Sequence, residues 1–121
     1  MATARGRPVL VAVIILLAVA LKAALSAVDA VPFNGDEAVV ALMARHILQG
    51  ERPIFFYGQA YMGSLDAWLI AGAFAVLGAS VTAIRVVQTL LFAGVLSTSY
   101  AVARRLTRSP RVALLTVILM A

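Results

Sequence analysis

The sequence contains no cysteine and a single histidine, His46. The missing cysteine excludes disulfides, thiolate metal sites and a cysteine nucleophile. Acidic residues are scarce as well, and none occurs outside positions 29–66; the five are Asp29, Asp36, Glu37, Glu51 and Asp66. Any chemistry that needs a carboxylate is therefore expected within this window.

Charged residues make up only 12% of the chain, whereas hydrophobic residues make up 64% and the mean hydropathy is +1.04. Soluble globular proteins have roughly 45–50% apolar and 25% charged residues. The composition therefore predicts a membrane protein. The net charge of +5 does not indicate a nucleic-acid partner, because the arginines stand at the ends of apolar runs and form no basic stripe interleaved with aromatics.

The first long apolar run covers residues 8–28 and follows Arg5 and Arg7. As a helix it extends about 31 Å, enough for a hydrocarbon core of roughly 30 Å. A cleavable signal peptide is the alternative, since Ala24-Leu25-Ser26 has the small-x-small pattern, but the run exceeds an h-region of about 7–15 residues. Lys22 is expected to snorkel to the headgroups, with an ion pathway as the alternative.

Two adjacent carboxylates in Asn34-Gly35-Asp36-Glu37 open a helix that we predict over residues 36–49. Asn34 and Glu37 have the spacing of a capping box, and Gly50 supplies the C-terminal stop. One face is expected to be apolar, with Val40, Met43, Ile47 and Leu48, and another to carry Glu37, Ala41, Arg45 and Gln49. At about 21 Å this helix is too short to span, so we expect it to lie on the membrane surface.

A second loop is predicted over residues 51–63, and its aromatic side chains are expected to anchor it in the headgroup region. A second surface helix is predicted over residues 64–78, with Ser64 as its N-cap and Asp66 in its first turn. At about 22 Å it is shorter than a comfortable span.

The uncharged run over residues 86–103 is long enough to cross the membrane. It leads into a basic loop, residues 104–111, that contains Arg104, Arg105, Arg108 and Arg111. The positive-inside rule places this cluster in the cytoplasm together with the N-terminus, so the helix over 64–78 is predicted not to cross. Residues 29–84 then form one external segment, with Arg85 at the outer interface. Residues 112–121 are expected to begin a further, truncated span of a larger polytopic chain.

Three stretches stand in a characteristic order after the first span: Gly35-Asp36-Glu37-Ala38, then Gly50-Glu51-Arg52-Pro53, then Tyr57-Gly58-Gln59-Ala60-Tyr61-Met62-Gly63-Ser64-Leu65-Asp66. This order resembles the start of the polyprenyl-phosphate-sugar-dependent membrane glycosyltransferases of the GT-C class. These family 39-like enzymes are related to protein O-mannosyltransferases and lipid A aminoarabinose transferases. The resemblance covers essentially all 121 residues, but only the first part of such an enzyme. The best-known relatives have Lys-Pro where this chain has Gln59-Ala60-Tyr61, so a lysine contact to the lipid phosphate cannot be carried over.

The resemblance implies an all-α membrane fold whose external segment carries two juxtamembrane helices, in the plasma membrane of a prokaryote. It implies transfer of a sugar from a polyprenyl-phosphate donor to an acceptor hydroxyl on the external face, with Asp36 as the catalytic carboxylate and Glu37 beside it. Gln59, Tyr61 and Ser64 are candidates for binding the donor phosphate or sugar. The implied partners are the lipid-linked sugar, membrane lipids and the remainder of the chain.

Such a transfer needs a base near the acceptor oxygen and stabilisation of the departing phosphate. Asp36 stands in the first turn of its predicted helix, where the helix dipole favours the ionised carboxylate. Two alternatives stay open. Asp36 and Glu37 are also candidate ligands for a divalent cation, although two carboxylates are too few for a complete site, or both acids simply cap the helix.

The rival class of function is a polytopic transporter, a flippase or a non-catalytic membrane subunit. Transporters place functional groups near the bilayer midplane on broken helices, whereas the carboxylates here lie in an external segment, which favours the enzyme. His46 has no nearby acidic partner in the sequence and is expected to be an interfacial side chain. A cytosolic nucleotide-sugar site is not indicated, because the sequence has no Walker loop, dinucleotide fingerprint, zinc spacing or serine-nucleophile motif.

Overall fold

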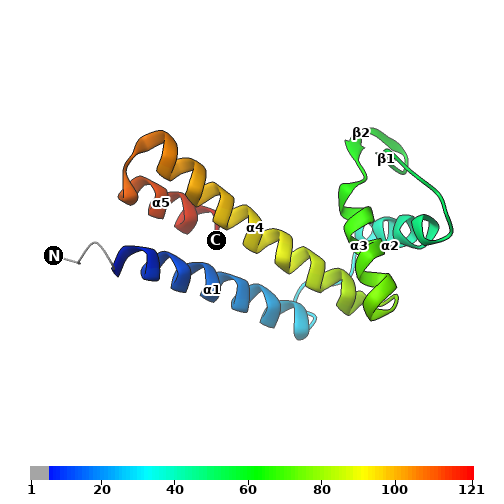
Figure 1. The fold of residues 1–121 in the computed structure, drawn as a ribbon. Coiled ribbons are helices and arrows are strands. Elements are labelled where there is room, and N and C mark those ends of the chain that lie inside the picture. Colours follow the sequence, from blue (N-terminus) through cyan, green and yellow to red (C-terminus); the bar gives the residue numbers. More distant parts are fainter. Residues whose placement is uncertain (1–5) are drawn as a thin grey trace. The chain divides into compact units, whose positions relative to one another are not determined.

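A computed structural model describes residues 6–121, which form five helices and one β-hairpin (Figure 1). In chain order the elements are α1 (Gly6–Ala27), α2 (Gly35–Leu48), β1 (Phe55–Phe56), β2 (Gln59–Gly63), α3 (Leu65–Leu77), α4 (Val81–Thr107) and α5 (Pro110–Met120). The chain divides into two compact units, and α4 contributes to both. Residues 26–88 are called the acidic unit because they contain every carboxylate side chain, and residues 1–25 with 89–121 are called the basic unit.

Two helices are long and apolar enough to cross a membrane, judged by length and composition: Val9–Ala27, with a mean hydropathy of 2.7, and Val81–Thr107, with 1.6. The first matches the predicted span over residues 8–28. The second is longer than the predicted run over residues 86–103, because α4 begins after Ser80, whose hydroxyl accepts the Ala83 N–H at 3.2 Å. Arg85 therefore lies within the first two turns of α4, and its location at the outer interface stays a prediction.

The predicted capping box of α2 is confirmed. The Asn34 side chain accepts the Glu37 N–H at 3.0 Å, and the Glu37 carboxylate accepts the Asn34 N–H at 3.3 Å. The helix ends in a Schellman motif, in which Gly50, at φ 105°, donates to the Ile47 carbonyl and Glu51 donates to the His46 carbonyl, both at 3.0 Å. The chain reverses at Gly50 and runs back along the end of α2.

The segment predicted as a loop over residues 51–63 contains a short antiparallel hairpin instead. Gly58, at φ 78°, lies in the turn, and the register is irregular between Phe55 and Phe56. Two residues in β1 are too few to show an alternating pattern in the sequence. The fold of the described residues is mostly helical, in line with the predicted all-α class, and this hairpin is an addition that the sequence did not predict.

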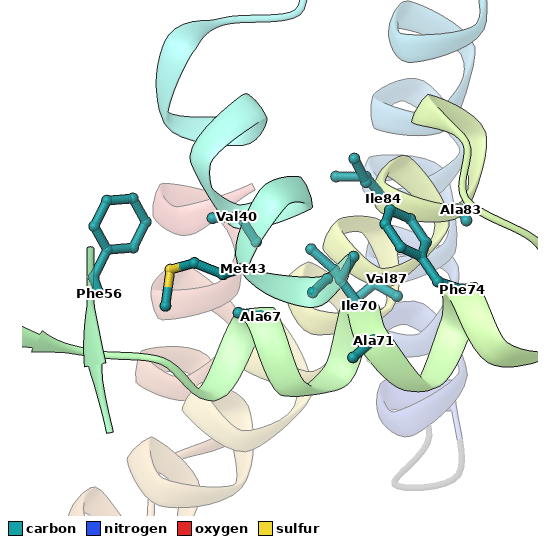
Figure 2. Packing of buried hydrophobic residues seen from close by; sticks show 11 residues of the cluster. Val40, Met43, Phe56, Ala67, Ile70, Ala71, Phe74, Ala83, Ile84 and Val87 are labelled. Atoms are coloured by element: carbon teal, nitrogen blue, oxygen red, sulfur yellow. The ribbon is translucent and has the colours of Figure 1, made fainter. Parts of the chain in front are cut away.

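The hydrophobic core of the acidic unit lies between α2 and α3 and includes the first turns of α4 and Phe56 of β1 (Figure 2). Met43, Ala44 and Ala67 are fully buried, and the small alanine side chains let the two helices approach closely. The apolar face of α2 is thus covered by protein. The predicted apolar face was partly wrong. Ala44, which was not assigned to this face, is buried, whereas Leu48, which was assigned to it, is 52% exposed. Glu37 belongs to this buried face and not to the polar one.

The predicted basic loop over residues 104–111 is largely helical. Arg104 and Arg105 form part of the last turn of α4, Arg111 lies in α5, and only Arg108 and Ser109 connect the two helices. The Ser109 hydroxyl caps α5 by accepting the Val112 N–H. Leu96 of α4 and two α5 residues, Ala113 and Val117, are buried in this part of the basic unit.

Candidate functional site

Glu37 is the best-anchored acidic side chain in the acidic unit. One carboxylate oxygen, Oε2, accepts the Asn34 N–H. The other, Oε1, lies 3.1 Å from a guanidinium nitrogen of Arg85 and accepts a hydrogen bond from the Gln88 amide at 3.0 Å. Both carboxylate oxygens are therefore occupied by donors from the protein.

This ion pair is shielded from solvent, since the side chains of Arg85 and Glu37 are 13% and 10% exposed. Arg85 also donates from Nη2 to the Val31 carbonyl oxygen at 2.9 Å, so its guanidinium ties the chain before α2 to α4. Removing one partner of a buried ion pair leaves an uncompensated charge, which makes such pairs strong structural constraints. Together, Arg85 and Gln88 fix α4 against the first turn of α2.

Asp36 differs from Glu37 in its exposure to solvent and in its partners. It is exposed, and its carboxylate has no hydrogen bond or ion pair with any described residue. Successive helix residues point about 100° apart, so when Glu37 faces the core Asp36 faces solvent. The sequence ranked Asp36 first and Glu37 second as catalytic groups, and the structure gives the two residues different surroundings: Asp36 is free to meet a ligand and Glu37 is held.

The candidate donor-binding residues are distributed around the hairpin. Gln59 begins β2 and is half-buried, Tyr61 is 84% exposed, and Ser64 is buried. Ser64 stands at the predicted N-cap position of α3, but its hydroxyl makes no cap; it donates to the carbonyl oxygens of Pro53 at 2.6 Å and Ile54 at 3.1 Å. No hydrogen bond or ion pair within the described residues joins these three side chains to Asp36 or Glu37.

A polar cluster that the sequence analysis missed joins α2 to the hairpin. His46 Nδ1 lies 3.0 Å from the Tyr57 hydroxyl, which donates to Glu51 Oε2 at 2.5 Å, and His46 Nδ1 is 3.7 Å from the same carboxylate oxygen. His46 thus has an acidic partner in the fold, Glu51, which the sequence analysis did not identify, and its interfacial location stays a prediction. The reversal at Gly50 brings Glu51 back to His46. The glycine stop in the sequence was therefore the signal from which this pairing could have been predicted.

Glu51 raises the pKa of Tyr57 above its ordinary value near 10, mainly because the hydroxyl proton is shared with the carboxylate, with further contributions from burial and from the negative charge. The folded state therefore holds this proton more tightly than the unfolded state. The resulting stabilisation is present below pH 10 and is lost as the pH rises through the pKa of folded Tyr57.

We expect Glu51→Gln to return the pKa of Tyr57 toward 10, because the substitution removes both the charged acceptor and the repulsion of tyrosinate. Tyrosinate absorbance during an alkaline titration measures this change, with Tyr57→Phe subtracted to isolate Tyr57 from the other tyrosines. Asp29→Asn removes an exposed carboxylate elsewhere and is the control. An unchanged Tyr57 titration in Glu51→Gln would contradict the assigned hydrogen bond.

A divalent cation does not fit the Asp36–Glu37 pair well. The described residues contain no group of three or more histidine, aspartate or glutamate side chains able to hold a metal ion. The Glu37 oxygens already accept protein donors and lie beside a guanidinium group, which repels a cation. Asp36 is left as a single free carboxylate, and Ca²⁺ or Mg²⁺ sites need several oxygen ligands.

No protein-family model, curated protein or solved structure matches this chain.

Proposed function

We propose that this chain is the N-terminal part of an integral membrane glycosyltransferase, which moves a sugar from a polyprenyl-phosphate donor to an acceptor hydroxyl on the external face. The observation that carries the proposal is the contrast between two adjacent carboxylates. Glu37 is buried and bound by Arg85 and Gln88, whereas Asp36 is exposed and without a protein partner among the described residues. A fixed helix start that presents one free carboxylate suits a catalytic base.

The apolar surface of α1 supports the membrane location. Leu16, Leu17 and Leu21 are each more than 60% exposed. Burial of apolar surface is worth about 25 cal/mol per Å², so a row of leucines left in water is unfavourable and a hydrocarbon environment relieves the cost. The topology proposed from the positive-inside rule puts the acidic unit on the external side, where lipid-linked sugars are presented.

In the proposed reaction the acceptor oxygen attacks the anomeric carbon of the sugar. A new carbon–oxygen bond forms, the bond between the anomeric carbon and the phosphate oxygen breaks, and the polyprenyl phosphate leaves with the bonding electrons. Asp36 accepts the hydroxyl proton as the acceptor attacks. Glu37, Arg85 and Gln88 act as positioning residues, because they hold the first turn of α2 and thereby the backbone of Asp36.

A transporter or flippase is the competing function, and the described helices do not favour it. Transporters typically bind substrate at discontinuous helices near the midplane, whereas α1 and α4 are continuous over their described lengths. The deciding experiment supplies membrane vesicles that contain the complete enzyme with a radiolabelled polyprenyl-phosphate sugar. Movement of the label from lipid to an acceptor hydroxyl supports the transferase; translocation of intact labelled lipid without transfer supports a flippase.

The proposed topology predicts which side of the membrane each segment faces. Single cysteines at Gln49 and Ala79, both exposed, are expected to react with a membrane-impermeant maleimide from outside, and a cysteine at Leu106 only after the membrane is opened. The cysteine-free parent chain supplies the background. External labelling at position 106, or protection of position 79 in intact cells, would contradict two crossings.

A further inference from the structure

The four arginines around the α4–α5 connection have no carboxylate within their own unit, because residues 1–25 and 89–121 contain neither aspartate nor glutamate. All four side chains are exposed. The only hydrogen bond of these guanidinium groups within the described residues runs from Arg104 to the Arg108 carbonyl oxygen, at 3.3 Å. The charge of this cluster must therefore be balanced by anions from outside the unit.

A groove of about 470 Å³ lies beside this cluster, between the last turns of α4 and the first turns of α5. Its volume is within the range of roughly 300–1,000 Å³ that is usual for small-molecule sites. Leu106 and Thr107 line the groove, and in the sequence they stand between Arg105 and Arg108. The arginine cluster is thus at one end of the groove.

The groove is lined mainly by apolar atoms, including those of Val102 and Val112. Its three threonine hydroxyls each donate to a carbonyl oxygen one turn earlier in the same helix: Thr98 to Gly94 and Thr107 to Ala103 at 2.8 Å, and Thr116 to Val112 at 3.0 Å. These donors are already used, so the threonines offer no free hydrogen-bond donor to an occupant. Ser99 is the one hydroxyl side chain of the lining without a hydrogen bond among the described residues, and a single free hydroxyl among mainly apolar atoms suits a hydrocarbon chain better than a sugar.

We propose that this groove binds one acyl chain of an anionic phospholipid, whose phosphate pairs with the arginine cluster. A basic cluster at the cytoplasmic end of a membrane helix attracts anionic lipid, and the groove converts this general attraction into a defined position. The inference rests on the membrane location of α4 in the proposed function. It does not depend on the catalytic role of Asp36.

The test uses the complete protein in a neutral detergent, titrated with phosphatidylglycerol or phosphatidylcholine and followed by native mass spectrometry. Phosphatidylglycerol is expected to be retained in preference to phosphatidylcholine. Each arginine near an anionic headgroup contributes about fivefold to binding, so Arg108→Gln/Arg111→Gln should lower the affinity for phosphatidylglycerol about 30-fold and leave phosphatidylcholine unchanged. Arg45→Gln/Arg52→Gln makes the same charge change at exposed positions of the acidic unit and should have little effect.

A second variant tests the groove separately from the charge. Val102 is 54% exposed and lines the groove, so Val102→Phe fills the groove without disturbing the buried core, and it should also weaken retention of phosphatidylglycerol. Any one of three results would overturn the proposal. These are retention of phosphatidylglycerol that survives Val102→Phe, equal losses of affinity in the two double-arginine variants, and displacement of the lipid by millimolar inorganic phosphate. Extraction of the protein from vesicles by alkaline carbonate would overturn the membrane location itself. Transferase activity that is lost while the lipid preference remains would count only against the enzyme.

Discussion

Asp36→Asn is expected to lower the rate of sugar transfer by about 10²–10⁴-fold, the usual effect of losing a general base. The asparagine keeps the size of the side chain but cannot accept the proton of the acceptor hydroxyl. Folding should survive, because Asp36 is exposed and its carboxylate has no hydrogen bond or ion pair with other described residues. The assay measures transfer from a polyprenyl-phosphate sugar by the complete enzyme in membranes, with expression matched by immunoblot.

Asp66→Asn is the matched control for this experiment. Asp66 also lies in the first turn of a helix of the acidic unit, where its carboxylate accepts the Ala67 N–H at 2.8 Å. The same chemical change should therefore leave transfer close to that of the unmodified enzyme. Near-normal activity in Asp36→Asn would reduce Asp36 to a residue of the helix start and would remove the main support for the transferase.

The second large effect concerns stability. Glu37→Gln is expected to reduce the free energy of unfolding by about 3–5 kcal/mol, because the Arg85 guanidinium would stay buried without a counter-charge. Arg85→Met leaves the Glu37 carboxylate in the equivalent position and should cost a similar amount. The double variant removes both charges and should lose less than the sum of the two single variants.

Reversible denaturation in detergent measures these free energies, and the double-mutant cycle isolates the coupling between the two side chains. Arg45→Met, at an exposed position of the same helix α2, is the control and should change stability by no more than about 0.5 kcal/mol. Additive losses in the cycle would show that Glu37 and Arg85 act independently, against the ion pair assigned here.

The helices of this chain could be predicted from the sequence because their signals are local. Two long apolar runs, the Asn34–Glu37 capping box and the glycine stop at Gly50 each lie within a few neighbouring residues, and the helix boundaries derived from the last two signals agree closely with α2. The surroundings of Asp36 and Glu37 could not be derived in the same way. They depend on Arg85 and Gln88, which reach Glu37 only after α3 and α4 have packed.

The burial of Glu37 could have been predicted from the sequence. Glu37, Val40 and Ala44 have the spacing i, i+3 and i+7, which places the carboxylate on the face that becomes buried. The assignment of Glu37 to the polar face of Ala41, Arg45 and Gln49 was therefore wrong. The hairpin was harder to predict, since β1 has two residues, and the cluster of His46, Glu51 and Tyr57 forms only once the hairpin has folded back.

The base of the hairpin is held by hydrogen bonds that do not involve its turn. Ser64 binds Pro53 and Ile54 through its hydroxyl and Ile54 again through its N–H, and the Trp68 indole donates to the Pro53 carbonyl at 3.2 Å. None of these bonds involves residues 58–62, most of which belong to β2 and pair with β1, so the base of the hairpin is held independently of the turn at Gly58. Doubling the length of a flexible loop costs only about 0.6 kcal/mol, so an insertion at the Gly58 turn should leave α2 and α3 packed as they are.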